Sequence, residues 1–167
     1  VVSGANANLV KTGAGTLTLL GANTYTGATN VNVGTLKLGA ANRIANTSAV
    51  TVNGGTFDIG AFSDTVGVVT LTNGAITGTT GVLTGTSYAM RNGTVSAILG
   101  GTGALTKTTA GTVTLSKANT YTGLTTVSAG TLVEGVNNAL AGGAVTVNGG
   151  TFDIGAFSDT VGVVTLT

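Results

Sequence analysis

The 167-residue sequence contains no cysteine, proline, histidine or tryptophan, and only 7% of its residues are charged. Without cysteine there are no disulfides or thiolate metal sites, so packing and hydrogen bonds alone must stabilise the fold. A nucleophilic triad needs histidine or cysteine, and the chain has neither. A serine–lysine arrangement would need Ser116 and Lys117, but these adjacent residues would point to opposite faces of a strand. We therefore expect no enzyme activity, no catalytic residue, no metal and no cofactor.

The composition also argues against nucleic-acid-binding and membrane-spanning proteins. The net charge is +1, and the six basic residues are scattered, so phosphate-binding clusters and nucleic-acid partners are not expected. No apolar run reaches the roughly 18 residues of a transmembrane helix, and we expect no membrane insertion of this segment. The first residues, VVSGANAN, show no signal peptide.

Glycine, threonine and valine dominate instead, with 29 glycines in all. Threonine and valine favour extended backbone, and the strong helix formers glutamate, lysine and glutamine are nearly missing. The composition therefore predicts an all-β protein.

A Gly-Thr-apolar tripeptide recurs about every 19 residues, with Gly74-Ala75-Ile76 in one of the eight positions. The apolar residue keeps one phase of a period-two alternation. It defines a predicted core stack of Leu17, Leu36, Phe57, Ile76, Val95, Val113, Leu132 and Phe152. The preceding residue defines a predicted outward ladder of Thr16, Thr35, Thr56, Thr94, Thr112, Thr131 and Thr151.

A unit of about 19 residues is too short to close its own core but fits one turn of a solenoid. We expect a right-handed parallel β-helix of eight to nine coils, with equivalent residues stacked about 4.8 Å apart. Glycine would supply the positive φ angles that the corners require. The absence of proline fits this fold, because proline would interrupt the hydrogen bonds between coils.

A longer period also exists. The segment from Ala49 to Thr72 returns unchanged as Ala144 to Thr167. The chain is thus expected to be one solenoid segment over residues 1–167 that belongs to a longer array. It would be built from a super-repeat of about 95 residues, with copies at about 1–96 and 97–167.

Two stretches carry a specific motif: LVKTGAGTLTLLGANTYTGATNVNVGTLKLG from Leu9 and LTKTTAGTVTLSKANTYTGLTTVSAGTLVEG from Leu105. Both have Leu-x-Lys-Thr, Gly-Thr-apolar-Thr-apolar, Ala-Asn-Thr-Tyr-Thr-Gly and a closing Gly-Thr-Leu. They resemble the autotransporter-associated β-strand repeat, or passenger-associated transport repeat. That resemblance implies a β-helical, extracellular or surface-exposed bacterial protein, usually exported through an outer-membrane barrel. No barrel segment is visible here.

The acidic residues allow alternative interpretations. Asp58 and Asp64, repeated as Asp153 and Asp159, could bind Ca²⁺ or act as acid and base, but the calcium motif is absent and Ca²⁺ needs about six oxygens. We favour solvent-facing or turn-capping roles, with Lys37 and Asp58 as a weak surface pair. Glu134 falls on the inward phase, and we expect a local bulge to turn it toward water, a buried acid being the alternative.

Surface binding is a further hypothesis. Tyr25 and Tyr121 occupy equivalent turns and are possible surface contacts for sugars, although such residues often anchor a turn. Thr-x-Thr rows could bind ice, but the rows are interrupted by Lys37, Asp58, Val133 and Asp153. A β-branched ladder that favours strands explains them better.

The sequence thus predicts a structural extracellular repeat protein that forms a stalk, sheath or fibre. The alternative is an adhesin that binds glycan or a host surface through a lateral face, and a polysaccharide lyase or hydrolase lacks the charged groove it would need. The expected partners are flanking repeats or copies of the chain stacked end to end, with lateral self-association as an option.

Overall fold

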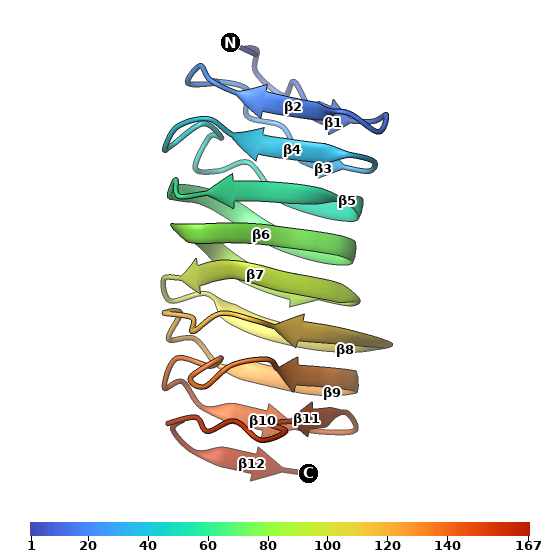
Figure 1. Ribbon diagram of the computed structural model, residues 1–167, viewed down its shortest axis with the longest axis vertical. Coiled ribbons are helices and arrows are strands. Elements are labelled where there is room, and N and C mark those ends of the chain that lie inside the picture. Colours follow the sequence, from blue (N-terminus) through green and yellow to red (C-terminus); the bar gives the residue numbers. More distant parts are fainter.

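The computed structural model describes residues 1–167 and contains β-strands but no helix (Figure 1). The strands form successive rungs along the long axis, and the two termini lie at opposite ends. Their bounds are β1 Leu9–Lys11, β2 Thr16–Leu19, β3 Thr29–Val31, β4 Thr35–Leu38, β5 Val50–Gly60, β6 Asp64–Met90, β7 Gly93–Gly100, β8 Ala104–Leu115, β9 Thr125–Glu134, β10 Val145–Val147, β11 Thr151–Asp153 and β12 Val164–Leu166. No segment forms an apolar helix of membrane-spanning length.

All strand pairings are parallel, and each joins one coil to the next. Leu17 pairs with Leu36, Leu36 with Phe57, and Phe57 with Ile76. The predicted β-solenoid is therefore confirmed, with about eight turns that repeat every ~19 residues.

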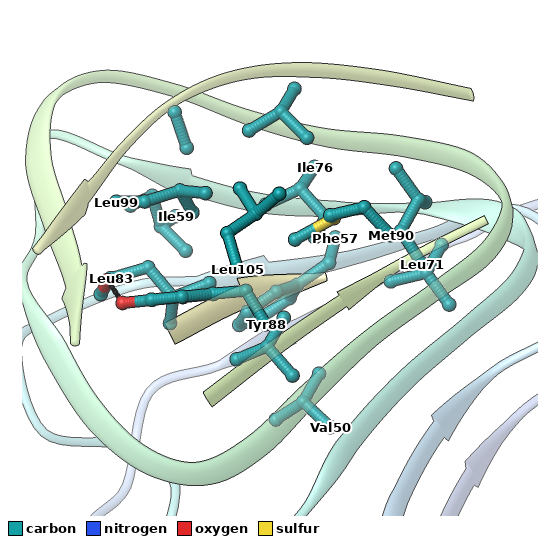
Figure 2. Close-up of a cluster of buried hydrophobic side chains, with 14 of the residues drawn as sticks. Val50, Phe57, Ile59, Leu71, Ile76, Leu83, Tyr88, Met90, Leu99 and Leu105 are labelled. Atoms are coloured by element: carbon teal, nitrogen blue, oxygen red, sulfur yellow. Dashed lines mark hydrogen bonds between the residues drawn. The ribbon is translucent and has the colours of Figure 1, made fainter. Parts of the chain in front are cut away.

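The interior is a single cluster of 29 buried hydrophobic residues. Figure 2 shows side chains from several coils, among them Phe57, Ile76 and Leu105, pointing into this common core. Of the predicted core stack, Leu36, Phe57, Ile76, Val95, Val113 and Leu132 are fully buried. Leu17 is 39% exposed and Phe152 is half-buried, because each lies in a terminal coil that is covered on one side only.

The predicted stack is wrong at one step. Val95 pairs with Leu115, and Val113 lies opposite Gly93. The facing bends explain this shift, because the bend from Lys107 to Val113 is longer than the bend from Met90 to Gly93 that it pairs with. The shift is by an even number of positions and preserves the inward phase, so both valines remain buried.

The predicted threonine ladder follows the same path. Thr16, Thr35 and Thr56 pair in sequence, and Thr112, Thr131 and Thr151 do so in the later coils. Between these groups Thr94 pairs with Thr114 rather than Thr112. All seven predicted ladder threonines are exposed or half-buried, so their side chains line the outer face of the solenoid.

Candidate functional site: repeated motifs and a lateral groove

Two lysines lie in the wall of the core instead of on the surface. Lys11 pairs with Val31, and Lys107 pairs with both Met90 and Val127, which places each lysine in an inward file of apolar residues. Lys11 is 6% exposed and Lys107 is fully buried. The sequence contains a signal for this placement. Six of the eight units have an apolar residue three positions before the glycine of the Gly-Thr-apolar tripeptide or its Gly-Ala-Ile counterpart. The other two units have Lys11 or Lys107 four positions before that glycine.

The buried ammonium groups bind main-chain oxygens at the bend. The Lys11 Nζ donates to the carbonyls of Gly13 at 2.7 Å and Val33 at 3.0 Å, and Lys107 donates to Thr109 and Ala129. Each lysine therefore links its own bend to the bend of the next coil. Burial lowers the pKa of Lys107, since no carboxylate compensates for the lost solvation.

The asparagine of each Ala-Asn-Thr-Tyr-Thr-Gly turn spans three successive coils. The Asn119 Oδ1 accepts from the Leu99 amide at 2.8 Å, and its Nδ2 donates to the Ala139 carbonyl at 2.6 Å. Asn23 makes the same pair of bonds with Val2 and Arg43. Because both asparagines are buried, they satisfy backbone groups that water cannot reach.

The tyrosines of these turns face inward, so the prediction of Tyr25 and Tyr121 as surface contacts is wrong. Tyr25 is fully buried and Tyr121 is 1% exposed. Their hydroxyls form hydrogen bonds with Thr29 at 2.6 Å and Thr125 at 2.8 Å. The buried threonine hydroxyl gives each phenol a partner inside the core, which removes the usual reason for a tyrosine to reach water. Burial raises the pKa of both tyrosines.

These buried motif residues lie within two segments, 9–38 and 105–133, that match the family model of the passenger-associated-transport repeat. These two segments are similar to that repeat family. The resemblance seen in the sequence is thereby confirmed, and in this chain the motif lysine lies at the bend, the asparagine bonds across three coils and the tyrosine lies in the core.

One curated relative is the "Adhesin BmaC autotransporter" of Brucella suis biovar 1 (strain 1330). It is 50% identical to this chain over 60 residues, which is 35% of this chain and 2% of the relative. The chain thus spans a very small part of that protein's length. No solved structure matches the chain.

Outside the repeats, the aspartates cap turns, as the sequence predicts. The Asp58 Oδ1 accepts from the Gly60 amide at 2.9 Å, and its other oxygen lies 3.3 Å from the Lys37 Nζ, which confirms the predicted surface pair. The buried Asp64 accepts from the Arg43 and Ile44 amides of the preceding coil. Burial nevertheless raises the pKa of Asp64.

Glu134 contradicts the prediction that it faces water. It stays in register opposite Leu115 and is 2% exposed, so no bulge turns it outward. Burial and the adjacent Asp159 carboxyl raise the pKa of Glu134 to about 8. Asp159 comes from the following coil, and its carboxyl disfavours the charged form of Glu134.

The lateral surface contains one hollow of about 300 Å³. It crosses several coils and is lined by the loop before β5, the start and the later part of β6, and the turn after β7. Its polar side chains are Asn46, Thr65, Thr84, Thr86 and Thr102, and Val66 is its one hydrophobic lining residue. Hydroxyl and amide groups without any charge can hydrogen-bond a neutral polar ligand.

Proposed function

We propose that this chain is a rod segment of an extracellular bacterial passenger, and that its role is to form a stalk, sheath or fibre at the cell surface. The two segments that match the passenger-associated-transport repeat and the autotransporter relative support the extracellular setting. Export across the outer membrane and exposure on the cell surface belong to this proposal.

The structural role is supported by the contacts that the motif asparagine, lysine and tyrosine make inside the solenoid. Asn119 bonds two neighbouring coils, Lys107 bonds the next bend, and Tyr121 is sealed in the core. These residues act between coils, where no ligand reaches them. The proposal therefore assigns mechanical continuity to the chain and no catalysis.

End-to-end stacking on flanking repeats or on another copy is part of the same proposal. Leu71 is fully buried beneath the following coil, whereas its duplicate Leu166 is 75% exposed. Another coil stacked on this end would therefore bury Leu166 in the way that the following coil buries Leu71. Covering it would remove apolar surface from water at about 25 cal/mol per Å².

The test is to image the native polypeptide and to locate it. Antibodies against this segment should label intact cells, and electron microscopy of the released protein should show rods that contain the segment. A globular particle, or labelling only after the cells are lysed, would contradict the proposal.

A second candidate function is adhesion to a neutral glycan through the lateral hollow. The hydroxyl-lined depression favours it, and the relative's printed name describes an adhesin. A glycan array should then show binding that Thr84→Ala with Thr86→Ala removes, while Thr112→Ala on the outward ladder leaves it unchanged. Equal binding by all three proteins, or no binding, would eliminate this candidate.

A further inference from the structure

The inward file that contains Glu134 exists in two versions in this chain. In the first repeat the equivalent residue is Leu38, which is fully buried and pairs with Leu19. In the second motif stretch, one residue beyond the matched segment 105–133, Glu134 pairs with Leu115 and is 2% exposed. The fold therefore builds the same coil with leucine, and a carboxyl group is not needed to form it.

Both Glu134 side-chain oxygens lack a hydrogen-bond donor, and so does the Asp159 Oδ1. The other Asp159 oxygen accepts from the Leu140 amide at 2.7 Å, which fixes this carboxyl on the adjacent bend. Asp64 makes the equivalent bonds in the first half of the chain, where it faces no second acid in this file.

No cation neutralises the two acids, because the single salt bridge of the chain joins Lys37 to Asp58. The other titratable group that faces the pair is Tyr121, from the turn between β8 and β9. Its hydroxyl is bonded to Thr125 and is neutral below strongly alkaline pH. Three unpartnered oxygens are also too few for Ca²⁺, which takes six to eight.

We propose that Glu134 and Asp159 share one proton and form a pH-sensitive joint between the coil of β9 and the final coil, and that loss of the proton loosens this joint. A shared proton supplies the missing donor, and it leaves one negative charge in the interior instead of two. This inference does not depend on the proposed function.

The joint is firm in acid and weak in alkali. The raised pKa of Glu134, about 8 against an ordinary 4.5, means that the folded chain binds more protons than the unfolded chain between these values. Stability conferred by the pair is therefore complete below pH 4.5 and is lost progressively as the pH rises from there through about 8. Because the chain has no histidine, few other groups titrate across this range.

Amide hydrogen exchange of the full 167-residue chain tests the proposal. Peptides within residues 132–143 report on the joint and peptides within 36–48 on its leucine counterpart, whereas peptides from the two copies of the duplicated segment cannot be told apart by mass. After correction for intrinsic exchange, protection in 132–143 should fall at least tenfold between pH 6 and pH 9. Protection in 36–48 should change much less.

Substitutions supply matched controls. Glu134→Leu copies the first repeat and should remove the pH dependence, and the near-isosteric Glu134→Gln should do the same. Leu38→Glu opposite Asp64 should transfer the dependence to residues 36–48. The proposal is overturned if protection in the natural chain is flat with pH, if Glu134→Leu keeps the slope, or if added Ca²⁺ restores protection at pH 9.

Discussion

Replacing Asn119 with alanine should destabilise the solenoid more than any exposed asparagine replacement. The substitution removes the bond from the Leu99 amide and the bond to the Ala139 carbonyl. Asn119 is 6% exposed, so water does not readily replace the lost partners. The substitution therefore breaks the link between three coils at once.

The expected loss in the free energy of unfolding is about 2–4 kcal/mol, because a typical hydrogen bond contributes about 1 kcal/mol net and a buried group left without a partner costs roughly 1–3 kcal/mol. The two lost bonds together give the stated range if the backbone relaxes in part. Urea denaturation followed by circular dichroism measures the change, with hydrogen exchange to locate it because repeat proteins can unfold coil by coil.

Asn53→Ala is the matched control. The Asn53 Nδ2 donates to the Asn32 side chain at 3.1 Å on the exposed surface, so its loss should cost less than about 0.5 kcal/mol. If Asn119→Ala costs no more than Asn53→Ala, the asparagine does not hold adjacent coils together.

Three further substitutions test other parts of the structure by the same denaturation assay. Tyr121→Phe leaves the buried Thr125 hydroxyl without its partner and should cost about 1–2 kcal/mol, and an unchanged midpoint would refute this bond. Gly130→Ala should cost several kcal/mol (about 3 or more), because its φ is 65° and the added methyl would overlap the Gly111 carbonyl; a cost below about 1 kcal/mol would refute that contact. Lys37→Ala should change stability by less than about 1 kcal/mol, because the Lys37 side chain of the ion pair is 48% exposed. A larger loss would show that the ion pair stabilises the chain more than a solvated surface pair does.

The periodicity of the sequence was sufficient to predict the solenoid because each coil repeats the same inward phase. Leu36, Phe57 and Ile76 fall in line from spacing alone. The shift between Val95 and Val113 could not be obtained in this way, because it depends on the length of two bends that face each other in space.

The side chains at the candidate site were harder to predict than the strands. Tyr121 lies in a turn rich in small polar residues, a composition typical of exposed loops, and only the position of Thr125 inside the core reveals why its hydroxyl is buried. Glu134 was expected at the surface because an isolated buried carboxylate is costly. Its neighbour Asp159 belongs to the next coil, so the pair becomes visible only when the coils are stacked.

The most direct test of the stacking is a pair of cysteines in this cysteine-free chain. Thr112 and Thr131 are partners in adjacent parallel strands, where the Cα separation of about 4.8 Å permits a disulfide. Thr112→Cys with Thr131→Cys should therefore oxidise readily, whereas Thr126→Cys with Val133→Cys, which would face each other only in a hairpin around Gly130, should remain reduced. A disulfide in the second pair and none in the first would contradict the stacked-coil structure.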